Sequence, residues 1–473
     1  MTLLLLVIPL LGFILVNIPP AGSLRKPLIA CPLLLSLLQV VLMIFPEAGW
    51  WTAFEAGPSV LPFLRVDGIS MLMLLAIGLV VAASSAISIP MIRDDTQRHN
   101  FVNLVLLSLL GMNGMVMVTD LFSLYVFLEI VSVCSFILIA LCGEREMFQG
   151  AFTYIILSAV ATMLMLTSIA ILFLYAGNTS FTTLAAAIAA QQGNAMVLFG
   201  VVLFLIGLFI KGGIVPFHGW LPDAYSSSVA PVSILLAGIV TKVSGVYTLI
   251  RLVTEVFGPT PRTNEVLLFV GTLSIVAGAL GALGQRDFKR MLAYSSISQV
   301  GYIVLSLGAG NALGIAGAIF HLFNHTVFKT QLFMNATAVE EQTGSRDLER
   351  MGGLASRMPV TGWTSIIAFL SAAGIPPLAG FWSKLVIVMA LVRSGHEIYM
   401  MIAILASLLT LAYFLTLQRK VFFGEIVEEF KDVREAGWLV TAPALVFAAI
   451  IVITGLAIPF LLNTIILPIG SIL

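Results

Sequence analysis

The chain has 473 residues, of which 60% are hydrophobic and only 10% are charged. Soluble proteins carry about 25% charged residues, so this composition excludes an ordinary soluble enzyme and indicates a membrane protein. Lys and Arg together number 23, as do Asp and Glu, and the zero net charge argues against nucleic acid as a partner. Cys31, Cys134 and Cys142 share no ligand spacing, so we expect no metal site and no cofactor.

Apolar runs follow one another along almost the whole chain. Because a helix needs about 20 apolar residues to cross a bilayer, these runs predict an all-α polytopic fold of about fourteen transmembrane helices. The first run lacks the basic segment and cleavage site of a signal peptide, so we expect it to be retained. The spans are expected at 2–19, 28–46, 68–91, 100–118, 121–142, 149–176, 196–226, 229–251, 264–284, 290–308, 313–338, 360–394, 398–418 and 437–462.

The distribution of Lys and Arg predicts the orientation, because cytoplasmic loops are enriched in both. Most basic residues fall in one set of alternating loops. The opposite loops hold only Arg65, Arg251, Arg262 and Arg393. With an even number of spans, both termini are expected on the outer side of the cell membrane.

Two spans are interrupted by glycine and proline. Proline has no N–H to donate and glycine loosens the backbone, so a helix breaks at such positions. A broken helix is tolerated in hydrocarbon only where protein or water satisfies its backbone, and paired breaks in two halves of a chain indicate a transporter's ion path. The residues at the two breaks are Gly212, Gly213 and Pro216, and Gly374, Pro376 and Pro377.

These breaks divide the chain into similar parts. We expect residues 1–98 to hold the first three spans and 99–255 to form a five-helix repeat. Residues 256–420 would form a second repeat, inverted because each repeat has an odd number of spans, and 421–473 the last span.

Several ionisable residues fall inside the spans, where each charge costs about 2.5–3.5 kcal/mol. Glu129 lies in an apolar run and Lys211 directly precedes the first break. They are either members of an ion path or a structural ion pair. Lys242 is in mid-span, where it either carries a proton or anchors carbonyls of the broken helix.

His321, His325 and Lys329 fall at i, i+4 and i+8, which places them on one stripe of a helix. A metal site is disfavoured because no Asp, Glu or Cys stands nearby to complete it. Histidine titrates near neutral pH, so a proton relay is the better interpretation.

Further polar residues lie near these positions. His218 either joins the same path or caps the broken backbone, and Lys384 either joins it or extends its ammonium toward the surface. Tyr294, Ser298 and Gln299 are candidates to hold water along a relay, although such residues also serve helix packing.

The motifs occur in a fixed order: LFSLYVFLEI at 121–130, KGGIVPFHGWLPDA at 211–224, LLAGIVTK at 235–242, DFKRMLAYSSISQVGY at 287–302, HLFNHTVFK at 321–329 and GIPPLAGFWSK at 374–384. This ordered set resembles the antiporter-like subunits shared by respiratory complex I, Mrp cation/proton antiporters and membrane-bound hydrogenases. The resemblance covers nearly the whole chain.

The resemblance implies a fourteen-helix fold with two inverted repeats and a central chain of charges that conducts protons. It implies that Glu129 and Lys211 are the switching pair and that Lys242 and Lys384 are the lysines of helices eight and twelve. His321, His325 and Lys329 match the relay of helix eleven.

Three features depart from the family pattern, and two of them, Lys384 and the C-terminal end, inform the branch. Lys384 stands where one complex I branch has glutamate, and Gln299 stands where several relatives have histidine. We also expect no long lateral helix of the kind that the largest members carry. Together these features resemble the D subunit of Mrp or a hydrogenase-type subunit.

We therefore expect a proton-translocating subunit with no catalytic centre of its own, within an Mrp-type antiporter or a membrane oxidoreductase. Its expected partners are other integral membrane subunits, peripheral iron–sulfur or nickel–iron subunits, lipid, protons and Na⁺. The alternatives are a quinone-contacting redox subunit, a membrane scaffold, and a coupling subunit for inorganic-anion uptake.

Overall fold

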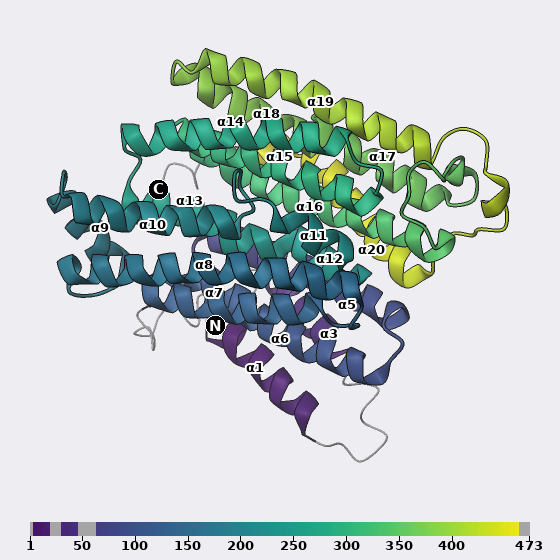
Figure 1. Ribbon diagram of the computed structural model, residues 1–473, viewed down its shortest axis with the longest axis horizontal. Coiled ribbons are helices and arrows are strands. Elements are labelled where there is room, and N and C mark those ends of the chain that lie inside the picture. Colours follow the sequence, from purple (N-terminus) through teal and green to yellow (C-terminus); the bar gives the residue numbers. More distant parts are fainter. Residues whose placement is uncertain (1–2, 19–29, 46–62, 463–473) are drawn as a thin grey trace. The chain divides into compact units, whose positions relative to one another are not determined.

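The computed structural model describes residues 3–18, 30–45 and 63–462. Within these ranges the chain is all-helical, with 81% of residues in helices and no strand (Figure 1). Nine of the described helices are long and apolar enough to cross a membrane. The predicted all-α polytopic fold is thereby confirmed.

Each predicted span contains at least one helix. In chain order the helices are α1 (Leu4–Asn17), α3 (Cys31–Ile44), α5 (Gly68–Met91), α6 (Asp95–Met117), α7 (Leu121–Ile139), α8 (Arg145–Ala176), α10 (Ala195–Lys211) with α11 (Trp220–Ser227), the segment Ala230–Phe257, α14 (Pro261–Leu283), α15 (Phe288–Gly308), α16 (Ala312–Thr343), α17 (Pro359–Ala373) with α18 (Ala379–Arg393), α19 (Glu397–Val421) and α20 (Trp438–Leu456). A short helix, α9 (Phe181–Ala190), precedes α10, and α21 (Ile458–Leu461) follows α20. The ends of the first two predicted spans, and residues 463–473 of the predicted C-terminal part, lie outside the described residues.

The chain forms two compact units. Unit 1 comprises Met1–Gly212, Ser227–Val232 and Ile239–Gly258, and unit 2 comprises Gly213–Ser226, Ser233–Gly238 and Pro259–Leu473. The chain passes from one unit to the other inside the first interrupted span. The predicted division at residues 98, 255 and 420 concerns repeats rather than compact units, and it stays a prediction.

Both predicted breaks are present. α10 ends at Lys211 and α11 begins at Trp220, and Gly213 between them has a φ of +64°. α17 ends at Ala373, where Gly374 has a φ of +87° and closes the helix with bonds from its N–H to the carbonyls of Leu370 and Ser371. Glycine adopts such positive φ without the steric cost that other residues incur.

In unit 1, α8 packs along α10, and α6 packs along α7 and α1. Two buried amides tie the first helices to this unit. Gln39 of α3 donates to the carbonyl of Leu74 at 2.8 Å and to Oδ1 of Asn113 on α6 at 3.0 Å. Asn113 returns a bond to Oε1 of Gln39 at 2.8 Å and donates to the carbonyl of Leu5 at 3.0 Å.

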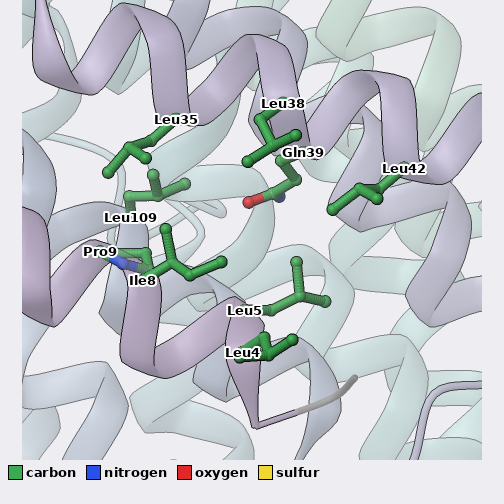
Figure 2. A pocket seen from close by; sticks show the side chains of 9 residues that line it. All are labelled: Leu4, Leu5, Ile8, Pro9, Leu35, Leu38, Gln39, Leu42 and Leu109. Carbon is green, nitrogen blue, oxygen red and sulfur yellow. The ribbon is translucent and has the colours of Figure 1, made fainter. Parts of the chain in front are cut away.

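A groove between α1 and α3 is lined in part by Gln39 (Figure 2). Its lining is aliphatic apart from Gln39, which is buried and already bonded on both amide atoms. None of the residues that line the groove is ionisable. The groove therefore offers nothing to a proton or a cation, and the ionisable residues that concern function lie elsewhere.

The eighth span, Ala230–Phe257, is not a regular α-helix, which the sequence analysis did not predict. It alternates α12 (Ala230–Leu235) and α13 (Thr248–Leu252) with π-helical segments η1 (Leu236–Val240), η2 (Lys242–Tyr247) and η3 (Val253–Phe257). Such wide turns are rare and are frequent at functional sites.

The π-helical segment η2 packs against the end of α10 within unit 1. A Cβ added at Gly245 would lie 2.3 Å from both Cα and N of Gly212. Only glycine at position 245 leaves room for this backbone contact. It holds the segment that carries Lys242 directly against the residue that follows Lys211.

In unit 2, α14 and α15 pack along each other, and α16 contacts α15, α17, α18 and α20. Nearly every residue of α16 from Gly314 to Val339 is buried. A helix that is covered on all sides and still carries two histidines and a lysine places these groups inside the unit, away from lipid.

Candidate functional site

Glu129 and Lys211 meet in unit 1, as the sequence analysis expects. Glu129 lies on α7 and Lys211 is the last residue of α10, and the distance from Nζ to Oε1 is 3.5 Å. The Lys211 side chain is 2% exposed, whereas that of Glu129 is 30% exposed. The pair therefore joins a fully buried ammonium to a carboxylate that lies partly open.

Both members of this pair have closer partners that carry no charge. The Lys211 ammonium donates to the hydroxyls of Ser132 at 2.7 Å and Ser158 at 2.6 Å. Glu129 accepts a bond from the hydroxyl of Thr162 at 2.6 Å. Because these contacts do not depend on the ion pair, each group keeps a polar partner when the two separate.

Lys242 is fully buried at the first residue of η2. Its segment packs on α10 and on α6 within unit 1. The contact between Gly245 and Gly212 fixes the backbones that carry Lys242 and Lys211 together.

His321 of α16 lies within a set of polar partners in unit 2. Its Nδ1 is 2.8 Å from the hydroxyl of Ser383 on α18, and its Nε2 is 3.2 Å from Oε1 of Gln299 on α15. The His321 and His325 rings stack with centroids 6.5 Å apart, so the two histidines lie on one stripe as predicted. Both ring nitrogens of His321 therefore lie within hydrogen-bonding distance of a polar side chain.

Lys384 is buried, so the alternative in which its ammonium extends to the surface is wrong. Its Nζ lies 4.5 Å from the ring centroid of Tyr302 and donates to the hydroxyl of Ser407 at 3.3 Å. A cation over an aromatic face is stabilised by the ring quadrupole. Tyr302 also stands beside His321, with ring centroids 5.9 Å apart, so one tyrosine borders both ionisable groups.

Lys329 lies farther along α16. Its Nζ donates to the carbonyl of Leu292 at 2.9 Å and to the hydroxyl of Ser295 at 2.8 Å, and Ser295 in turn is 2.8 Å from the hydroxyl of Tyr413. A lysine, a serine and a tyrosine thus form a continuous chain of exchangeable groups.

The remaining candidates differ in the partners that they contact. Gln299 contacts His321, whereas Ser298 donates to the carbonyl of Ile275 on α14 at 3.0 Å. The rings of His218 and Tyr294 approach edge to face with centroids 6.4 Å apart. The structure therefore brings Gln299 to the histidine stripe and pairs His218 with Tyr294.

Two basic residues expected in loops are buried: Arg251, which is counted among the loop residues above, and Lys289, which directly precedes the predicted span 290–308. Arg251 is 4% exposed and binds Asp67 and Glu255. Lys289 is 2% exposed and pairs with Glu340 at 2.6 Å. Counting basic residues in loops treats each one as solvated, whereas a carboxylate at i+4, as Glu255 is to Arg251, was an available sign of pairing.

Comparison with known proteins gives consistent matches. A family model described as NADH:quinone oxidoreductase/Mrp antiporter, TM, matches residues 118–410. The chain is 39% identical over 324 residues to the N subunit of the NADH-quinone oxidoreductase of Desulforudis audaxviator, a match that covers 68% of this chain and 64% of that relative. It is 32% identical over 393 residues to the D subunit of the Na(+)/H(+) antiporter of Alkalihalophilus pseudofirmus, with 82% and 80% covered.

Among solved structures, a chain of the Mrp complex from Dietzia sp. DQ12-45-1b matches with a TM-score of 0.87 at 25% identity, over 98% of this chain and 95% of that one. The matched structures are multisubunit membrane complexes.

Proposed function

Because the chain belongs to the NADH:quinone oxidoreductase/Mrp antiporter family of membrane subunits, we propose that it moves protons as one subunit of a larger membrane complex. The residues proposed to carry the protons are Glu129, Lys211, Lys242, His321, His325, Lys329 and Lys384. His218, Tyr294 and Gln299 assist as relays, whereas Ser298 serves packing.

The loose pair of Glu129 and Lys211 is the observation that carries this proposal. A permanent structural ion pair is most stable at close hydrogen-bonding distance, and removing one partner from a buried pair is costly. Here the two charges stand 3.5 Å apart and each already has a hydroxyl partner. The pair can open without stranding either charge, which lets Lys211 release its proton once Glu129 moves away.

The test is Glu129→Gln in the intact complex, reconstituted into liposomes and supplied with its driving reaction. The amide keeps the shape and loses the charge, so we expect normal assembly and a loss of transport of about ten-fold or more. Glu144→Gln, which changes an exposed carboxylate before α8, is the matched control and should transport normally. Near-normal transport by Glu129→Gln would reduce the pair to a structural contact.

We propose further that this chain is the D subunit of an Mrp-type antiporter or the corresponding subunit of a membrane-bound hydrogenase. Lysine at position 384 supports this assignment. We also propose that both of its termini lie on the outer side of the plasma membrane. The residues proposed to carry protons are mainly lysine and histidine, whose cationic forms repel a bare cation, so Na⁺ exchanged by the complex would use another subunit.

Copurification with an iron–sulfur or nickel–iron subunit would distinguish a redox complex from an antiporter. A reporter fused after Leu473 tests the topology, and cytoplasmic activity would contradict it.

A further inference from the structure

A second charged cluster of unit 1 lies at the far end of the span that carries Lys242. Arg251 binds Asp67, the residue before α5, in a two-pronged contact of 2.7 and 2.9 Å. Arg251 also binds Glu255 at 2.6 Å, and the more exposed Arg65 binds the same carboxylate at 2.6 Å. The cluster thus ties the end of the eighth span to the start of α5.

Each nitrogen of the buried guanidinium has an acceptor. Nε donates to the hydroxyl of Tyr247 at 3.1 Å, Nη1 donates to Asp67 and Glu255, and Nη2 donates to Asp67 and to Ser70 at 2.8 Å. A guanidinium has five N–H donors and no acceptor, and it stays protonated in proteins. Arg251 can therefore neither receive a proton nor release one.

The carboxylate opposite Arg251 is equally fixed. Burial alone would raise the pKa of Asp67, but Arg251 and two hydrogen bonds from Ser70 hold this pKa well below its usual range. Asp67 therefore remains charged at neutral pH and is a poor proton acceptor.

The hydroxyls between Lys242 and Glu255 offer no alternative route. Ser244 donates to the carbonyl of Val240, Thr248 to that of Val243, Thr254 to that of Ile250, and Tyr247 to that of Val116. These are the four hydroxyl side chains in this stretch. A proton passes along hydroxyls only when each donates to another exchangeable group, and a backbone carbonyl is not one.

We propose that Arg251 and its partners form a plug, which closes unit 1 to protons between Lys242 and the Glu255 end of the eighth span. The inference rests on the proposed function, since it assumes that Lys242 carries a proton. It assigns to Arg251 a positioning role that the sequence analysis missed. A proton on Lys242 leaves by a route that does not include this end of the span.

The experiment measures passive proton entry into liposomes that hold the whole complex without its driving reaction, under an imposed K⁺ diffusion potential. Arg251→Gln removes the buried guanidinium and leaves Asp67 and Glu255 with only the more exposed Arg65. Water can then enter the space that the guanidinium filled, so we expect proton conductance to rise about ten-fold. Arg98→Gln, which removes a positive charge near the start of α6 outside the cluster, should conduct as the unaltered complex does.

A double variant shows whether the leak uses the proposed path. Adding Lys242→Met to Arg251→Gln should return conductance to the unaltered level, because the leak would have lost its internal carrier. A leak that persists in the double variant is a general packing defect and overturns the proposal. So does a single variant that conducts no more than Arg98→Gln.

If the Arg251→Gln complex does not accumulate in membranes, the same conductance measurement on Arg251→Lys tests the plug. Lysine keeps the charge but has three N–H donors in place of five, so a smaller leak that Lys242→Met abolishes is expected. The absence of any leak from Arg251→Lys then overturns the plug. Driven transport through Glu129→Gln tests the proposed function separately, so the plug can fail while the proton path stands.

Discussion

Unit 1 contains two ion pairs, each with a buried basic side chain, that are built in opposite ways. Arg251 and Asp67 meet through two short bonds, and all three nitrogens of the guanidinium are used. Lys211 and Glu129 stand 3.5 Å apart and are each held more closely by hydroxyls. The first arrangement holds two segments in one place, whereas the second leaves both charges partly satisfied when they separate.

The choice of cation follows from this difference. Arginine stays charged and binds carboxylates in a rigid two-pronged geometry, whereas a buried lysine changes its protonation readily. We call the Arg251–Asp67 pair the lock and the Lys211–Glu129 pair the proposed switch, because only the lysine can release a proton. The two pairs lie in the same unit, and the distances rather than the burial of the basic side chains distinguish them, since both basic side chains are nearly inaccessible.

The largest expected effect comes from converting the switch into a lock. Lys211→Arg keeps the positive charge but cannot release a proton at physiological pH, so transport should fall about ten-fold or more while the complex still assembles. Adding Glu129→Gln to this variant should make transport no worse, because the two residues act as one unit. Driven transport at matched protein amounts checks both, and appreciable activity in Lys211→Arg would contradict the switching role.

The next effect concerns the backbone contact between Gly245 and Gly212, the residue that follows Lys211. Gly245→Ala places a methyl 2.3 Å from Gly212, and because the obstacle is backbone, the cost is about 1–3 kcal/mol. We expect less assembled complex in the membrane, measured by immunoblot after purification. Gly219→Ala is the matched control, since nothing lies within 4 Å of its added Cβ. Equal amounts of the two variants would show that the contact can relax.

A smaller effect should follow from removing the hydroxyls that hold Lys211. With Ser132→Ala and Ser158→Ala together, opening the pair exposes an ammonium without a partner, so transport should fall about five-fold. Ser135→Ala is the control on the same helix as Ser132, because its hydroxyl donates to the carbonyl of Val131. The measurement is the rate of driven transport at matched protein amounts, and an equal loss in the control would indicate a packing effect.

The smallest effect is expected on the carboxylate side. Thr162→Val removes the one hydroxyl that Glu129 keeps when the pair opens, whereas Lys211 has two, so a smaller loss of about two-fold is expected. Thr167→Val changes an exposed hydroxyl farther along α8 and should transport normally. A loss as large as that of the double serine variant would show that the carboxylate depends on its hydroxyl partner as strongly as the ammonium does.

The sequence predicts the switch much better than the lock. Glu129 and Lys211 stand out because each interrupts an apolar run and the second adjoins a break, so their chemistry is visible from local pattern. Arg251 stands near the end of a predicted span, where basic residues normally mark a loop. Its partner Asp67 lies 184 residues away in sequence, and only the fold brings the two together.

The irregularity of the eighth span was hidden for a related reason. The stretch Leu235–Lys242 contains one glycine and no proline, so its sequence is compatible with an ordinary helix. The wide turns arise where the segment packs against α10 and α6, and Gly245 meets Gly212 there. A tertiary contact of this kind leaves little trace in hydrophobic periodicity.

The paired amides of Gln39 and Asn113 bear on how the chain is made. The two residues are 74 positions apart, and an interhelical hydrogen bond in a membrane contributes about 0.6–2 kcal/mol. At about 5–20 residues per second, α3 is synthesised about 4–15 s before its partner on α6 exists.

During that interval the Gln39 amide has no native acceptor on α6, and hydrocarbon supplies none. We therefore expect α3 to wait beside protein, in the insertion machinery or an accessory factor, until Asn113 arrives. Gln39 and Asn113, which have no part in the proposed proton path, would thus set the order in which the first helices of unit 1 are released into lipid.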